Sequence, residues 1–390
     1  MDTRAKLLEV RAVKGNQIAQ TVGRVRRISE GEYAVHSQRS DDWYQVVATE
    51  AGFNCSCPDF TNRAIKCKHI FAVEFSHVLR QTVEQQVKIE PLDIQSCLYC
   101  YSKSIIKRGV RHNKNGDIQR FLCHDCGKRF TKNLGFEGMK ASPQMITSAL
   151  QLYFTGESLR NTQKFLALQG VQVSHQTIHN WIRKYVGLME KYLDQIQPNL
   201  SPTWRADELW IKVKGDMKYL FAMMDDQTRF WIAQEVADSK EKHDARTLFH
   251  RSAEVAGTRP RLLITDGLRS YNDAFKREYT THFTSTNPIH VREIAITGRM
   301  HNNKMERMNG EVRDREKVMR GLKTTDSPIL KGYQLFHNYI RPHEALDGDT
   351  PADRCGIKVE GSNKWLTIIQ NASKVPRLDS ETKTRENPQT

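Results

Sequence analysis

Apolar and β-branched residues alternate with turn signals over the second half of the chain, and this pattern predicts a mixed sheet with helices. Three successive strands are followed by a helix, a strand and another helix, an order that favours helices on both faces of the sheet. Apolar residues at helical spacing, among them Met305, Met308, Val312 and Met319, predict a further helix over residues 302–313. The predicted strands span residues 203–213, 218–225, 230–236 and 261–265, and the other helices residues 240–256 and 270–279.

The region from residue 142 to residue 197 is helical by the same criteria. Ser142 and Pro143 mark the start of one helix, which ends at Gly156. A second helix spans residues 158–168, and Ser174 caps a third over residues 175–185. A short helix, a glycine turn and a capped basic helix together predict a helix-turn-helix.

In a helix-turn-helix the first turns of the last helix reach base edges in the major groove of DNA. The candidate DNA-binding residues are therefore Gln176, His179 and Arg183. Ile178, Trp181 and Ile182 are expected in the core. The alternative is a helical bundle that links domains without touching DNA.

The first 82 residues form a separate module in this interpretation. Strands are predicted over residues 17–27, 33–36 and 43–49, and a helix from Ile70. Between them lie two tight pairs of potential ligands. Three thiolates and one imidazole suit a closed, tetrahedral structural zinc site, and the alternative is a set of buried free cysteines. The candidate ligands are Cys55, Cys57, Cys67 and His69.

Residues 83–92 are polar and are predicted to be a linker, and residues 93–135 carry a second cysteine cluster. Two Cys-x-x-Cys pairs place four thiolates around one zinc ion, whereas a redox function is less favoured because no βαβ pattern surrounds them. Strands are predicted on both sides of the second pair, at residues 119–122 and 128–130. The candidate ligands are Cys97, Cys100, Cys123 and Cys126. Cys355 is left over, and plain packing is expected for it.

Composition narrows the class of partner. The chain of 390 residues is long enough for two to four domains, and its net charge of +15 points to a polyanion, most simply nucleic acid. The alternative is a basic surface without a partner.

No run of 18 apolar residues and no apolar N-terminal segment is present, so we expect no membrane span and a cytoplasmic, DNA-associated protein. In a reducing compartment, eight cysteines favour metal sites over disulfides. Residues 371–390 are polar and are expected to be disordered.

Three carboxylates stand at positions that can converge. Asp207 lies in the first predicted strand of the sheet, Asp266 ends the fourth before Gly267, and Glu306 lies on the last helix. Hard oxygen ligands of this kind suit Mg²⁺ bound to phosphate oxygens. The sequence therefore predicts a divalent-metal site built from two strands and a helix.

The order Asp, Asp-Gly and Asn-Asn-x-x-Glu, with Arg313 seven residues after Glu306, resembles the catalytic core of DDE-type insertion-sequence transposases. The segment of residues 336–351 resembles the same family, and the resemblance spans about residues 203–356. The two cysteine modules resemble the SWIM-type zinc finger and the zinc ribbon found in front of many transposases. Thirty-nine residues separate Asp266 from Glu306, more than in many members. Glu311 is the rival third acid, but the residue seven after it is Val318, which favours Glu306.

The resemblance implies a multidomain α+β and α/β protein with an RNase H-like catalytic domain. It also implies two Mg²⁺ ions, with Mn²⁺ as a possible substitute, bridged by Asp207 and completed by Asp266 and Glu306. Arg313 would contact a phosphate. The substrate would be double-stranded DNA, both transposon ends and target, bound by a homodimer or higher oligomer. Two other functions stay open: a non-catalytic DNA-binding regulator derived from a transposase, and an RNase H-like nuclease without strand transfer.

Overall fold

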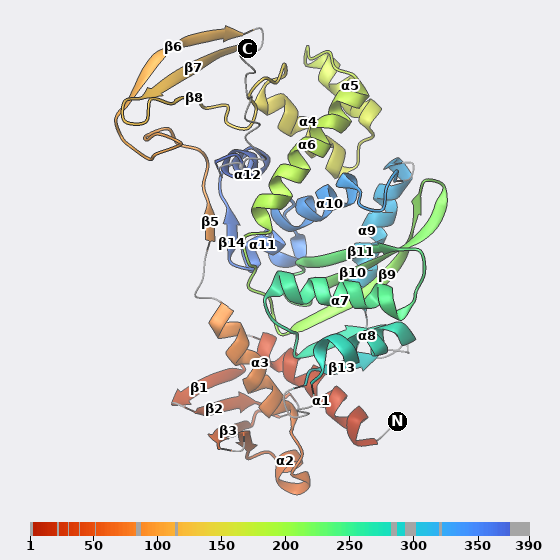
Figure 1. Ribbon diagram of the computed structural model, residues 1–390. Helices are drawn as coiled ribbons and strands as arrows, with labels where there is room; N and C mark the ends of the chain where they lie inside the picture. Colours follow the sequence, from red (N-terminus) through yellow and green to blue (C-terminus); the bar gives the residue numbers. More distant parts are fainter. Residues whose placement is uncertain are drawn as a thin grey trace, which may run out of the picture. The chain divides into compact units, whose positions relative to one another are not determined.

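The computed structural model describes residues 3–21, 23–29, 31–38, 40–50, 52–82, 87–113, 116–281, 287–292, 302–319 and 322–374 (Figure 1). The chain divides into two compact units, each made of several segments. The first unit comprises Met1–Val87, Gln197–Leu330 and Phe336–Lys358. The second comprises Lys88–Ile196, Lys331–Leu335 and Val359–Thr390.

A five-stranded mixed sheet is the centre of the first unit, in the order β11-β10-β9-β12-β13. The three-strand meander is antiparallel, while β12 runs parallel to both β9 and β13. This arrangement confirms the predicted mixed sheet, to which β13 adds a strand that the periodicity did not indicate. The strands are β9 (Thr203–Val213), β10 (Asp216–Asp225), β11 (Trp231–Ala237), β12 (Leu262–Thr265) and β13 (Ile289–Arg292).

Aromatic residues pack the helices α7 (Lys242–Ala256) and α8 (Arg269–Tyr279) against one face of this sheet. The Phe249 ring stacks on Tyr271 and Tyr279, with ring centroids 5.8 and 5.3 Å apart. Tyr279 in turn meets Trp204 of β9 edge-on at 6.2 Å. Each fully buried side chain of this size contributes about 1.5–3 kcal/mol of transfer free energy, so the cluster fixes both helices on the sheet.

The opposite face is covered by the N-terminal helix α1 (Thr3–Gln20) and by α3 (Lys68–Thr82). Ala12 and Phe75 belong to one cluster with Leu262 and Ile264 of β12. Because neighbouring strand residues point to opposite faces, Leu263 faces the other side. Helices therefore lie on both faces of the sheet, as predicted.

A small antiparallel sheet completes the N-terminal part of the first unit. Its strands are β1 (Val25–Ser29), β2 (Glu32–His36), β3 (Trp43–Thr49) and β4 (Gly52–Cys55), and α2 (Pro58–Arg63) follows it. The predicted strand over residues 17–27 is wrong, because α1 continues to Gln20 and β1 begins at Val25. The reason is tertiary packing: Ile18 is buried against the small sheet, and burial overrides a weak local preference. A Cβ at Gly15 would lie 2.4 Å from the Cβ of Phe71, so glycine permits the close approach of α1 and α3.

The rest of the first unit follows α9 (Asn303–Met319), which is longer than predicted. Next comes α10 (Pro328–Leu335), whose residues 331–335 belong to the second unit. The first unit resumes with a π-helical turn, Phe336–Ile340, a 3₁₀ turn (Glu344–Leu346) and α11 (Pro351–Arg354). Within the turn, the Asn338 amide accepts from the backbone N–H of Trp231 at 2.8 Å and donates to its carbonyl at 2.9 Å. Asn338 thereby substitutes for a neighbouring strand at the edge of β11.

Among its described residues, the second unit contains a three-stranded antiparallel sheet, several helices and residues 331–335 of α10. The predicted helix starts are confirmed, because Ser142, Ser158 and Ser174 each cap a helix with the side-chain oxygen. Helix α6 continues to Leu193, eight residues beyond the prediction, because Tyr185, Val186 and Met189 extend its buried face. The elements are β6 (Ile105–Asn113), β7 (Gly116–Cys123), β8 (Arg129–Thr131), α4 (Pro143–Thr155), α5 (Leu159–Leu168), α6 (His175–Leu193) and α12 (Lys364–Ala372).

The structure corrects two predictions about segments without regular structure. In the predicted linker of residues 83–92, Val87–Ile89 forms strand β5, and residues 83–86 lie outside the described residues. In the predicted disordered tail, residues 371 and 372 end helix α12, and residues 375–390 lie outside the described residues. Helix α12 is held by Trp365, which stacks on Phe154 at 5.6 Å and donates from Nε1 to Gln151 Oε1 at 2.8 Å. Strand β14 (Ile357–Val359) precedes α12 in the sequence.

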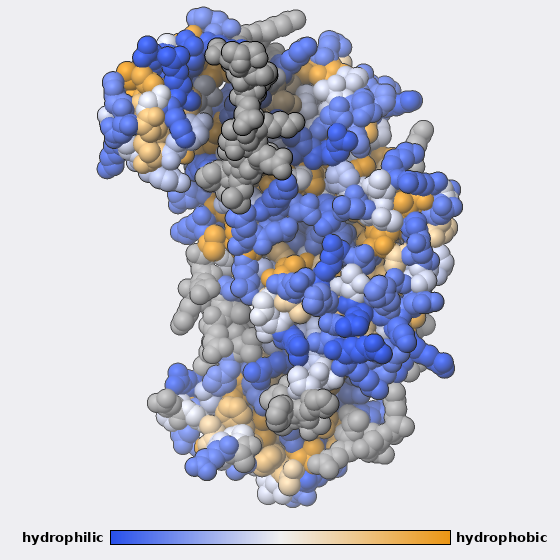
Figure 2. Space-filling model, viewed as in Figure 1, coloured by the Kyte–Doolittle hydropathy of each residue, from blue (hydrophilic) through white to orange (hydrophobic). Residues whose placement is uncertain are grey.

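Polar side chains cover much of the face seen in Figure 2, in keeping with the net charge of +15. No helix in the described part of the chain has the length and apolar character that crossing a membrane requires.

Candidate functional site

The parallel pairing of β9 and β12 brings two of the predicted acids together. Ile264 is paired with Arg205, and two residues further along the chain from each lie Asp266, just after β12, and Asp207 on β9. One carboxylate oxygen from each of Asp207, Glu208 and Asp266 lies within 4.8 Å of the others. The sheet register therefore builds an oxygen cluster at the end of β12.

Glu306 belongs to the first turn of α9 and is exposed. Two asparagines fasten that helix to β9: Asn302 Nδ2 donates to the carbonyl of Ala206 at 3.3 Å, and Asn309 Nδ2 donates to Asp207 Oδ2 at 2.9 Å. Glu306 is not part of the 4.8 Å cluster, but its negative charge acts on Asp207. The structure thus places Glu306 within electrostatic reach of Asp207.

Mutual repulsion dominates the electrostatics of the cluster after burial. Burial, and then the neighbouring Glu208 carboxylate, raise the pKa of Asp207 to about 7. The same two causes, in the same order, raise the pKa of Asp266. Carboxylates that are desolvated and crowded favour either a proton or a cation. Hard oxygen ligands of this type fit Mg²⁺, and the residues present therefore suit that ion.

Sequence reasoning missed Glu208, which shares the cluster. Its side chain is only 5% exposed, and its Oε1 lies 2.6 Å from Lys240 Nζ. The hydroxyl of Tyr271 donates to Oε2 at 2.8 Å. Both oxygens of Glu208 are thus engaged, one by Lys240 just before α7 and the other by Tyr271 of α8. The signal available in the sequence was the acidic pair at adjacent strand positions.

Glu311, the rival third acid, is also engaged. Arg341 binds it with both terminal nitrogens, Nη1 to Oε2 at 2.6 Å and Nη2 to Oε1 at 3.1 Å. Such a bidentate pair satisfies the carboxylate. By contrast, no hydrogen bond or ion pair of the Glu306 side chain occurs within the described residues, and the same holds for Arg313, which is exposed on α9.

The four residues of the first cysteine cluster lie close enough together to hold one metal ion. One ligand atom from each of its four residues lies within 4.8 Å of the others, and all four residues are buried. The Sγ atoms of Cys55 and Cys67 lie 3.8 and 4.0 Å from His69 Nδ1. Hydrogen bonding between Cys55 and Cys57 raises the pKa of the Cys55 thiol and lowers that of Cys57. The structure brings the predicted ligands Cys55, Cys57, Cys67 and His69 together.

The ligand atoms of the second cluster also lie within 4.8 Å of one another. Cys97 and Cys126 are 3.5 Å apart between sulfur atoms, as are Cys100 and Cys123. Four sulfur ligands about 2.3 Å from a zinc ion would be about 3.8 Å apart at the corners of a tetrahedron. The donor sets of both clusters therefore fit zinc. Cys355 is fully buried and belongs to neither cluster, which agrees with the expected packing role.

The three candidate DNA-binding residues lie along the first turns of α6. Gln176 and Arg183 are exposed, whereas His179 is half-buried. Burial, and then the charge of Arg183, lower the pKa of His179. Ile178, Trp181 and Ile182 are buried, as expected for the inner face of the helix. The outer face therefore presents a polar surface to solvent.

The part of the chain that carries the central sheet and the oxygen cluster is similar to known proteins. Residues 201–343 match the family model DDE_Tnp_IS240, described as a DDE domain. The match confirms, for this segment, the resemblance to DDE-type transposases. It does not extend to the cysteine modules or to helices α4–α6.

The relatives are insertion-sequence proteins. The chain is 26% identical over 161 residues to a Staphylococcus aureus transposase for insertion sequence-like element IS431mec. This match covers 38% of this chain and 70% of that protein. It is 24% identical over 186 residues to an insertion element ISM1 uncharacterized 48.3 kDa protein of Methanobrevibacter smithii, covering 44% of this chain and 45% of that protein.

Among solved structures, the HTLV-2 integrase catalytic core domain in complex with magnesium (trimeric form) is similar at 18% identity, with a TM-score of 0.30. The similarity covers 41% of this chain and 98% of that one. The dimeric form of the same domain gives 16% identity and a TM-score of 0.31.

Proposed function

We propose that this protein is a DNA transposase that binds transposon ends, cleaves DNA strands and joins the freed 3′-hydroxyl ends to target DNA. The observation that carries the proposal is the placement of Asp207 on β9 and Asp266 just after β12 in one oxygen cluster, within a DDE domain, with Glu306 in electrostatic reach of Asp207. Three acids arranged in this way suit phosphoryl transfer, in which a nucleophilic hydroxyl displaces another oxygen at phosphorus.

Each acid has a separate task in this proposal. Asp207 lies on β9, where a hydrogen bond from Asn309 Nδ2 fixes its Oδ2. Asp266 and Glu306 approach from β12 and from α9. When bound, two divalent ions would lower the pKa of the attacking water or hydroxyl and stabilise the leaving oxygen. Arg313, two turns beyond Glu306 on α9, would contact a phosphate of the DNA backbone.

The neighbouring acids are assigned to structural tasks. Glu208 holds Lys240 and Tyr271, and Glu311 holds Arg341, so each already has its partners. A carboxylate that forms a bidentate pair with arginine is a poor candidate for a metal ligand, since ligation would break that pair. This supports Glu306 over Glu311 as the third acid.

The remaining modules would supply DNA recognition. We assign structural zinc ions to both cysteine clusters and assign contacts with transposon ends to Gln176, His179 and Arg183. A homodimer or higher oligomer would bring two ends to one target, because each joining event needs its own active site. The double-stranded DNA of ends and target is therefore the expected substrate.

The test compares isosteric variants in a cleavage assay with Mg²⁺, on DNA that contains the element's ends, beside a DNA-binding assay. Asp207→Asn, Asp266→Asn and Glu306→Gln are each expected to abolish cleavage and joining while binding is retained, because an amide keeps the shape but loses the charge. Glu311→Gln is the matched control on the same helix and should remain active.

The outcomes separate the proposed function from its rivals. If all three variants cut as the parent does, the proposal fails. If Glu306→Gln is active and Glu311→Gln is not, the assignment of the third acid is wrong and the mechanism stands. A parent protein that cuts DNA but never joins the ends would be a nuclease, and one that binds without cutting would be a regulator.

A further inference from the structure

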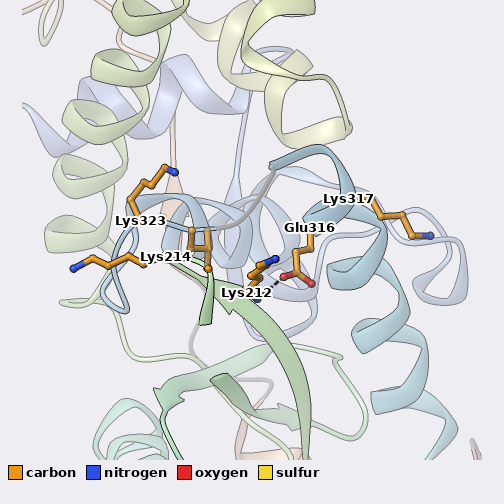
Figure 3. A pocket seen from close by; sticks show the side chains of 7 residues that line it. Lys212, Lys214, Glu316, Lys317 and Lys323 are labelled. Atoms are coloured by element: carbon orange, nitrogen blue, oxygen red, sulfur yellow. Dashed lines mark hydrogen bonds between the residues drawn. The ribbon is translucent and has the colours of Figure 1, made fainter. Parts of the chain in front are cut away.

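A lysine-lined pocket lies at the far end of the two elements that carry Asp207 and Glu306. Its volume is about 570 Å³, and Lys212, Lys214, Lys317 and Lys323 line it together with Glu316 (Figure 3). All four lysines are exposed. They come from the hairpin that joins β9 to β10, from the end of α9 and from the segment after α9.

The backbone under these lysines is fixed by hydrogen bonds. Leu322 N–H donates to the carbonyl of Lys212 at 2.8 Å, and Lys214 N–H donates to the carbonyl of Leu322 at 2.7 Å. Lys214 and Gly215 form the hairpin turn with φ values of 54° and 104°, as a two-residue turn of the primed type requires. The backbone that carries Lys212 and Lys214 is thus held in place by hydrogen bonds and by the tight turn.

The charges in the pocket are largely uncompensated. Its one acid, Glu316, directs Oε1 to the backbone N–H of Lys212 at 2.5 Å. Lys317 pairs with Asp314 at 2.7 Å, where both side chains are about three-quarters exposed. In the described ranges, the ammonium groups of Lys212, Lys214 and Lys323 have no carboxylate within ion-pair distance. Like charges gathered without neutralising partners favour an anionic ligand.

We propose that this pocket binds the phosphodiester backbone of the DNA on which the protein acts. Lysine offers a point charge to phosphate without reading sequence, and a pocket with four lysines can accept more than one phosphate group. The inference rests on the proposed function and extends it, because it places a second DNA contact on the strand and helix that hold the catalytic acids.

The location predicts a register along the DNA. Lys212 follows Asp207 by five residues, or about 17 Å along a strand. Lys317 follows Glu306 by eleven residues, or about 16 Å along a helix. Since one strand of duplex DNA carries a charge every 3.4 Å along the axis, the pocket would hold phosphates about five nucleotides from the cleaved one.

The experiment measures the salt dependence of binding to a fluorescein-labelled 30-base-pair duplex of arbitrary sequence. The slope of log K against log salt is expected to become shallower by about 1.8 in the double variant Lys212→Gln/Lys323→Gln, since each phosphate contact contributes about 0.9. The control, Lys242→Gln/Lys276→Gln, removes two exposed lysines of α7 and α8 and should retain the parental slope. Circular dichroism and thermal melting establish that both double variants are folded.

An unchanged slope in the Lys212→Gln/Lys323→Gln variant would overturn the inference, whatever the protein does to DNA. A shallower slope in a protein that fails to cut DNA would support the pocket and sink the proposed function instead. On a duplex that the parent does cut, ethylation of phosphates about five nucleotides from the cleaved one should impair cutting. In the double variant the same ethylation should add no further loss; an equal loss in both proteins would count against the pocket.

Discussion

Asp226 holds the start of helix α9 to the central sheet through a buried ion-pair network. Its Oδ1 lies 2.5 Å from Arg205 Nε of β9 and 2.9 Å from Lys304 Nζ of α9. Gln20 of α1 donates to the other oxygen at 3.1 Å. Because Lys304 stands two residues before Glu306, the network connects the N-terminal helix, the sheet and the turn that carries the third acid.

We expect Asp226→Asn to lower the free energy of unfolding by about 3–5 kcal/mol, the cost of removing one member of a buried ion pair. The Asp226 and Arg205 side chains are only 5% and 10% exposed, so the substitution would remove a counter-charge beside a buried guanidinium. Lys304 is 33% exposed and can turn toward water, which favours the lower end of that range.

Urea denaturation followed by tryptophan fluorescence measures the effect, because Trp204 is fully buried in β9 beside Arg205. Asp238→Asn is the matched control. Asp238 forms an ion pair with Lys218 but is 84% exposed, and such pairs contribute about 0–1 kcal/mol. If Asp226→Asn costs no more than Asp238→Asn, the network does not stabilise the fold and the reasoning is refuted.

The stability that Asp226 contributes depends on pH in a defined direction. Burial alone would raise the pKa of Asp226, but the charges of Arg205 and Lys304 outweigh it and hold the pKa well below its usual range. A carboxyl with a depressed folded-state pKa contributes stability above its unfolded pKa of about 3.9 and loses it as pH falls through the folded value. The difference between parent and Asp226→Asn should be constant from about pH 5 to 8 and shrink below about pH 4. A difference that grows as pH falls would contradict the assignment.

Three further predictions concern metal and DNA. Elemental analysis of the purified protein should find two zinc ions per chain, and Cys97→Ser/Cys100→Ser should remove one of them; zinc-free folded protein would rule out both sites. Arg183→Ala should weaken binding to transposon ends by about 1–3 kcal/mol if the side chain reaches a base, and an unchanged dissociation constant would exclude that contact. Burial, and then Glu208, raise the pKa of Asp207 to about 7, so a proton competes with Mg²⁺ below that pH. Calorimetric affinity for Mg²⁺ should therefore fall as pH decreases from 7 to 6 and change little between 8 and 9; equal affinity at pH 6 and 8 would disprove the competition.

Local patterns in the sequence were sufficient to predict most of the helices and strands and most of the residues of the candidate sites. The strand over residues 203–213 and the helix starts at Ser142 and Ser174 depend on alternation and on capping, which act within a few residues. The sequence also predicted the two cysteine clusters, because closely spaced pairs of cysteine and histidine are typical of metal ligands and of few other structures. The acids Asp207 and Asp266 could be selected because each stands in or just after an apolar strand.

Only the tertiary structure decided which side chains have partners, because those partners come from distant parts of the chain. Helix α1 replaces a predicted strand since its apolar face packs on α3 and on the sheet. The sequence favoured Glu306 over Glu311, but the bidentate pair that engages Glu311 comes from Arg341, thirty positions later. Asn309 on Asp207 and the lysines around the β9–β10 hairpin depend equally on packing between elements. Sequence periodicity reports the face on which a residue lies, but not which residue meets it there.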